Sequence, residues 1–149
     1  MITALNIAEQ ALSESLEIMA FMDIFPLDDE IQQPVPALLA GIDFSGPQNG
    51  RLEILAGNDF ADVLAENFAA QQHPGGSARA DAVKELANVT CGLIIPLICN
   101  TPSDIYNITV PDLISGDDCP EWKDFIASAE CRIINTEGML IAVKLKIDN

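Results

Sequence analysis

Four residues in the middle of the sequence have side chains that could do chemistry together: Asp81, Glu85, Asn88 and Gly92. On a helix, at about 100° per residue, they fall within about 60° of one another and form one stripe. The opposite side of the same helix carries residues typical of a core, namely Val83, Leu86, Ala87, Thr90 and Ile94. The outer stripe therefore presents two carboxylates, a carboxamide and bare backbone, and it is the best candidate site in the sequence.

Other catalytic motifs are missing from the chain. There is no G-x-S-x-G, no P-loop, no G-x-G-x-x-G and no cationic cluster to hold a free phosphate. The only histidine, His73, lies beside a proline in a glycine-rich stretch, so we expect no catalytic role for it. The spacing D-x-x-x-E-x-x-N is by itself most typical of a solvated helix. The residue types alone therefore leave the stripe without an assigned reaction.

Composition excludes several classes of partner. The 149 residues carry a net charge of −16, and no Lys or Arg precedes Arg51, which disfavours nucleic acid and anionic membranes. Three explanations fit the negative charge better: the protein binds a cationic patch on another protein, it has no charge-driven partner, or the acidic residues serve only to keep it soluble. The four cysteines form no close-spaced pair, so we expect buried thiols rather than zinc ligands. No apolar run reaches the roughly 18 residues of a membrane span, and the N-terminus lacks basic residues, so a cytoplasmic protein is expected.

Three helices are predicted around the stripe. Residues 3–22 have helical apolar periodicity with Thr3 as the N-cap, and a second helix starts at Asn58 or Asp59 and ends before residues 71–76. The third carries the stripe from a cap at Ser77 to about Ile95. Pro96 has no N–H for the Gly92 carbonyl, so a kink or loosening is expected there.

Strands are predicted on both sides of the two later helices. Residues 37–56 form a hairpin around the turn cluster at 45–50, whose strongest element is Asn49-Gly50, and residues 106–110 form a strand that ends at Pro111. Residues 130–134 and 139–147 form a closing hairpin, while 122–126 fit either a short helix or an edge strand. This order predicts a single α+β domain over 1–149, with a largely antiparallel sheet and long helices packed on one face.

The stripe and the later proline together match a known pattern. Asp81, three residues, Glu85, two residues, Asn88, twenty-two residues and Pro111 resemble the signature of the CheC/CheX/FliY chemotaxis phosphatases at every position and spacing. The first helix has no Asn after Asn6, so the second site of CheC-like members is missing. The chain therefore resembles a single-site, CheX-like member.

The resemblance implies a substrate, namely the aspartyl phosphate of a CheY-like response regulator. Asn88 would position the attacking water, and Glu85 would pair with the regulator's active-site lysine. Asp81 would either touch the partner or support the start of the helix. Gly92 would leave room for the partner's backbone, unless a close helix contact within the chain requires it. No cofactor of its own is implied, because the phosphorylated regulator would bring Mg²⁺.

The resemblance also implies a homodimer joined through sheet edges. Lys144 and Lys146 in the last strand offer another interpretation, in which they protect an edge from pairing. Pro111 is expected to act by ending a strand. Two other functions stay open: a CheX-like binding module that docks a receiver without turnover, and a structural subunit akin to flagellar switch components.

Overall fold

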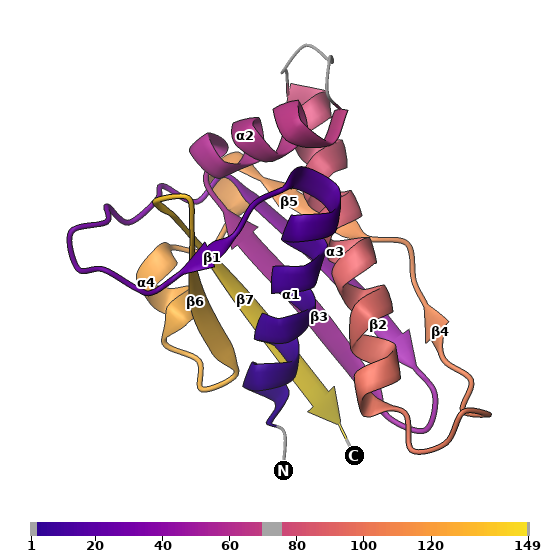
Figure 1. Cartoon of the computed structure of the whole chain (residues 1–149). Helices are drawn as coiled ribbons and strands as arrows, with labels where there is room; N and C mark the ends of the chain where they lie inside the picture. Colours follow the sequence, from indigo (N-terminus) through magenta and orange to yellow (C-terminus); the bar gives the residue numbers. More distant parts are fainter. Residues whose placement is uncertain (1–2, 70–75, 149) are drawn as a thin grey trace.

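The computed structural model describes residues 3–69 and 76–148, so the predicted loop around His73 lies almost wholly outside the described residues. The described helices and strands follow one another in the order that Figure 1 shows. They are α1 (Ala4–Ala20), β1 (Ile24–Phe25), β2 (Leu38–Ser45), β3 (Asn49–Ala56), α2 (Asn58–Ala69), α3 (Gly76–Ile98), β4 (Asn107–Ile108), β5 (Asp112–Ser115), the 3₁₀ turn η1 (Gly116–Asp118), α4 (Trp122–Ile126), β6 (Cys131–Thr136) and β7 (Met139–Asp148).

All strand pairs belong to one antiparallel sheet. Its order is β1-β6-β7-β3-β2-β4, and β5 also pairs with β2. The three long helices α1, α2 and α3 cover one face of this sheet (Figure 1). The predicted α+β class, with long helices on one face, is confirmed. None of the described helices combines the length and the apolarity that crossing a membrane requires.

Two apolar cores lie on the two faces of the sheet. The larger joins the helices to the sheet, and its fully buried members include Leu12, Leu16, Ile42, Leu52, Ile54, Leu86 and Ile94. The smaller lies on the other face, where α4 covers the sheet with Trp122 and Phe125. The segment 122–126, which the sequence left open, is therefore a helix, because both aromatic side chains are buried on one side of it.

Helices α1 and α3 pack directly on each other. The Thr90 hydroxyl on α3 donates to the Ser15 hydroxyl on α1 at 2.9 Å, and the Ser15 hydroxyl donates to the Ala11 carbonyl at 2.8 Å. Both buried hydroxyls are thus satisfied, which avoids the cost of an unpaired polar group in the core. At the start of α1, the Thr3 hydroxyl accepts from the Asn6 N–H, so the predicted N-cap is confirmed.

The first hairpin forms as predicted, and its turn lies within the predicted cluster at 45–50, just before Asn49-Gly50. Phe44 pairs with Gly50, so Asn49 and Gly50 begin β3 and residues 46–48 make the turn. The Asn49 side chain closes that turn by accepting from the Gly46 N–H at 3.3 Å. Gly50 is needed because a Cβ there would lie 2.3 Å from the Phe44 ring.

Helix α3 is longer than predicted at both ends. It begins at Gly76, so Ser77 lies inside it rather than capping it, and it continues through Pro96 to Ile98. The Cys99 N–H still donates to the Ile95 carbonyl at 3.0 Å, so the chain keeps its helical path after the proline. A proline at this position removes one hydrogen bond near the helix end, where few further bonds depend on it.

The strand predicted at 106–110 is shorter and is followed by a strand that the sequence did not predict. Ile108 pairs with Phe44, and Asp112 pairs with Gly41 on the same strand β2. Between these pairs β2 has residues 42–43, whereas the edge chain has residues 109–111, which is the extra residue of a β-bulge. The strand predicted to end at Pro111 therefore ends at Ile108, and Pro111 lies in the connection that joins β4 to β5.

Lys144 does not protect an edge, because it pairs with Cys131 on β6 and with Glu53 on β3, so that interpretation is wrong for this residue. Lys146 pairs with Arg51 on β3 and lies beyond the residues of β7 that pair with β6. β1 was also absent from the predicted elements, because a strand of two residues is too short to show a period.

Candidate functional site

Helix α3 carries the predicted stripe on its outer side. Val83, Leu86, Ala87, Thr90 and Ile94 are all fully buried, whereas Asp81, Asn88 and Gly92 are exposed and Glu85 is half-buried. The contacts of α3 with α1, α2 and β2 fix this rotation. The core side of the helix therefore determines which side chains the stripe presents.

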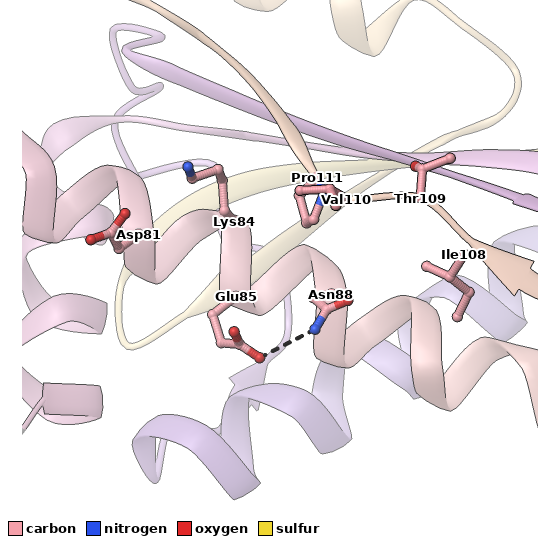
Figure 2. Close-up of a pocket in the computed structure, with 8 residues that line it drawn as sticks. All are labelled: Asp81, Lys84, Glu85, Asn88, Ile108, Thr109, Val110 and Pro111. Atoms are coloured by element: carbon pink, nitrogen blue, oxygen red, sulfur yellow. Dashed lines mark hydrogen bonds between the residues drawn. The ribbon is translucent and has the colours of Figure 1, made fainter.

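A groove of about 460 Å³ runs between α3 and the edge of the sheet. Figure 2 shows the α3 side chains on one wall and the β4–β5 connection on the other. The lining residues are Asp81, Lys84, Glu85, Asn88, Ile108, Thr109, Val110 and Pro111. The fold thus brings Pro111 next to the three polar residues that precede it by more than twenty positions, while Gly92 is outside the lining.

The bulge builds the far wall of the groove. The Thr109 N–H donates to the Asp43 carbonyl at 2.9 Å, and the Asp43 N–H donates to the Thr109 hydroxyl at 3.0 Å. These two bonds hold the bulge on β2, while Val110 projects outward and is 87% exposed. Pro111 then follows at a place where its missing N–H leaves no ladder bond unmade.

Glu85 and Asn88 lie one turn apart and contact each other. The Asn88 amide nitrogen donates to a Glu85 carboxylate oxygen at 3.4 Å, which is a long and weak hydrogen bond (Figure 2). The Asn88 carbonyl oxygen accepts no hydrogen bond from the described residues. The two side chains therefore hold each other only weakly, and the carboxamide oxygen of Asn88 is available to an incoming donor.

Asp81 does not stabilise the start of α3. The helix begins at Gly76, so Asp81 lies more than one turn inside it, and no acidic residue occupies the first turn. Interaction with the helix dipole falls off within that turn. Of the two roles the sequence left open for Asp81, contact with a partner is the one that its place in the groove favours.

Gly92 is not required by any contact with the part of the chain that the structure describes. A Cβ placed on it would meet no atom within 4 Å. The interpretation that Gly92 permits a close helix contact inside this chain is therefore wrong. The glycine leaves a flat, open patch of backbone one turn beyond Asn88, where another molecule can approach closely.

Sequence reasoning missed half of the groove. Lys84 lies between Asp81 and Glu85 in the sequence, but it is not one of the residues that form the stripe, so the stripe did not point to it. Ile108, Thr109 and Val110 carried no signal, because the twenty-two-residue gap of the motif points to Pro111 alone.

The cysteines contribute nothing to this groove. Cys91 is on the buried side of α3, and burial raises the pKa of its thiol to about 11. Burial also raises the pKa of the Cys119 and Cys131 thiols. Thiols of raised pKa are poor nucleophiles, and all four cysteines are free. Cys91 is buried as predicted, whereas Cys99, Cys119 and Cys131 are only half-buried.

Comparison with solved structures places the fold. The chain is similar to a CheX chemotaxis protein from Desulfovibrio desulfuricans, with a TM-score of 0.73 and 14% identity over 97% of this chain and 99% of that chain. It is similar to a chain of the CheX–CheY–BeF₃–Mg²⁺ complex from Borrelia burgdorferi, with a TM-score of 0.69 and 17% identity over 100% of both chains. Thermotoga maritima FliY has a TM-score of 0.62 and 12% identity over 98% of this chain and 86% of that chain. No family model and no curated protein matches the sequence. The CheX/CheC-like fold that the motif implied is confirmed.

Proposed function

We propose that this chain is a phosphatase that hydrolyses the aspartyl phosphate of a CheY-like response regulator. One observation carries the proposal: Glu85 and Asn88 face a groove that Pro111 closes on its far side, in a chain with the CheX fold. The solved complex of a CheX with a CheY supports a receiver as the partner.

Asn88 positions the attacking water in this proposal. An acyl phosphate is already labile, so the enzyme needs no nucleophile of its own and must hold a water in line with the phosphorus. The free Asn88 carbonyl oxygen accepts a hydrogen bond from that water. The water oxygen bonds to phosphorus, the bond from phosphorus to the aspartyl oxygen breaks, and the products are a carboxylate, inorganic phosphate and a proton.

Glu85 serves mainly in docking. A carboxylate beside a phosphoryl group is repelled unless it meets a cation, and the groove already holds a second carboxylate in Asp81. A lysine beside the regulator's phosphorylated aspartate supplies that cation, and pairing with it replaces the weak bond between Glu85 and Asn88. The regulator also supplies Mg²⁺, which neutralises charge on the phosphoryl oxygens.

The test is the rate at which a phosphorylated CheY-like receiver loses phosphate, measured with and without this protein. We expect Asn88→Ala to lower the acceleration by about 10²-fold or more, as for loss of a group that acts in the transition state. Gln10→Ala is the matched control, because it removes an exposed carboxamide from α1 outside the groove lining. Equal acceleration by the wild-type chain and Asn88→Ala would falsify the assignment.

A non-catalytic docking module remains the second candidate. The open backbone at Gly92 and the exposed groove serve binding as well as turnover. Binding of a phosphorylated receiver by the wild-type chain, without faster loss of phosphate, would favour this candidate.

A further inference from the structure

Among the described residues, Lys84 is the single basic side chain that lines the groove. It lies between Asp81 and Glu85 in the sequence, and both of these carboxylates also line the groove. Nevertheless, the Lys84 ammonium makes no ion pair with any carboxylate of the described residues. A half-buried lysine that leaves neighbouring carboxylates unpaired is free to bind an anion from outside the chain.

The other basic residues are occupied or face elsewhere. Four of them pair with the chain's own carboxylates: Arg51 with Asp43, Glu53 and Asp112, Arg79 with Asp62, Lys123 with Glu121, and Arg132 with Glu9. Lys144 lies over the Phe125 ring at 4.2 Å, on the face of the sheet away from the long helices, and Lys146 shares that face of β7. In a chain of net charge −16, Lys84 is thus the one Lys or Arg on the helical side that forms no ion pair among the residues that the structure describes.

The direction of Lys84 separates it from the proposed reaction centre. Figure 2 shows its side chain leaving α3 on a different side from Glu85 and Asn88, toward the sheet edge. Consecutive helix positions are about 100° apart, so Lys84 and Glu85 meet different points of any docked surface. The groove therefore offers a positive contact at Lys84 and a negative contact at Glu85 at separate points, with the Asp81 carboxylate as a second negative group.

We propose that Lys84 is a specificity residue that pairs with a carboxylate on the receiver surface, beside the phosphorylated aspartate. This inference rests on the proposed function and names a second determinant of its partner. Glu85 requires a cation on the receiver, and Lys84 requires an anion at a separate point. Two contacts of opposite sign fix the orientation of docking and reject receivers that carry like charges at either point.

The experiment compares Lys84→Gln with the wild-type chain on a CheY-like receiver phosphorylated by a small-molecule phosphodonor with Mg²⁺. We expect KM for the phosphorylated receiver to rise about three- to tenfold at about 50 mM salt, with kcat unchanged. The difference should shrink at about 300 mM salt, because screening weakens the wild-type contact. Lys146→Gln is the matched control with the same change in charge and should behave as wild type. Lys84→Arg should restore KM.

A fall in kcat with unchanged KM would overturn the inference, because the ammonium would then act on the phosphoryl group itself. Unchanged KM and kcat in Lys84→Gln would also overturn it, while leaving the phosphatase proposal intact. If the wild-type chain binds the receiver without turnover, the same comparison is made on Kd, and the phosphatase proposal alone fails. A wild-type chain that neither binds nor dephosphorylates receivers would overturn both.

Discussion

At the scale of single residues, the exposed stripe of α3 combines groups that have no structural use inside the chain. Glu85 and Asn88 share only a weak hydrogen bond, and Gly92 touches nothing that requires a glycine. A solvated helix gains nothing from an exposed glycine, which costs about 0.5–1 kcal/mol relative to alanine. These residues are therefore best explained by contact with another molecule.

Gly92 gives a prediction that separates stability from binding. Gly92→Ala should raise the free energy of unfolding by about 0.5–1 kcal/mol, because the Cβ meets no atom within 4 Å and helix propensity improves. Gly92→Leu should fold equally well but weaken receiver binding at least tenfold by filling the open patch. Thermal unfolding and a binding titration measure the two effects. Destabilisation by Gly92→Ala, or undiminished binding by Gly92→Leu, would contradict this role.

At the scale of elements, the two walls of the groove depend on how α3 is joined to β4. The Asp104 carboxylate closes the intervening turn by accepting from the Asn100 N–H at 2.8 Å and from the Thr101 hydroxyl at 2.9 Å. These bonds hold the pKa of Asp104 below its ordinary value of 3.8, the Asn100 backbone bond having the largest effect. The ionised carboxylate thus fixes the path from one wall to the other.

The direction of this shift predicts a local acid transition. Because the folded-state pKa is lowered, the turn gains its full stabilisation above pH 3.8 and loses it as pH falls through the lower folded-state pKa. The Asn100 and Thr101 amide NMR shifts should therefore titrate together with a midpoint below 3.8. Asp104→Asn should abolish that titration. A midpoint at or above 3.8 would show that the turn does not hold the carboxylate ionised.

At the scale of the whole molecule, the sheet has two outer edges of different character. β1 covers one edge with only two residues, whereas β4 and β5, which both pair with β2, form the other edge. Large apolar side chains are exposed along the second edge and its approach, namely Ile105, Ile108, Val110 and Ile114. An unpaired edge with exposed apolar residues favours association with another strand.

The homodimer expected from the resemblance therefore remains a prediction, now with a specific edge. We expect light scattering to give a dimer at about 100 µM, with association through β5. The exposed apolar residues along this edge would contribute to the buried area of about 800 Å² per partner that a typical protein–protein interface has. Ile114→Lys should shift the protein toward monomer, since a charge at an interface core must be desolvated. Ile18→Lys is the matched control, because Ile18 is also exposed but lies on α1. A monomeric wild-type protein would contradict the expectation.

The sequence by itself determined the features that depend on local periodicity and spacing. The buried and exposed sides of α3 follow from the helical repeat, and the two long hairpins follow from alternating apolar residues around turn residues. The spacing from Asp81 to Pro111 was enough to imply the CheX/CheC-like fold. These features are encoded within short stretches of chain, where each residue's neighbours are its neighbours in sequence.

Only the tertiary structure showed which residues form the wall of the groove opposite the stripe, namely those of the β4–β5 connection. Strands as short as β1 and β4 have no readable period, and their positions depend on pairing with distant residues. The extra residue within 109–111 forms a β-bulge, and this bulge builds the far wall of the groove. No local sequence pattern predicts such a register shift against β2. The unpaired state of Lys84 is decided in the same way. An ion pair needs two charged atoms within a few ångströms, and only the folded chain determines which charges come that close.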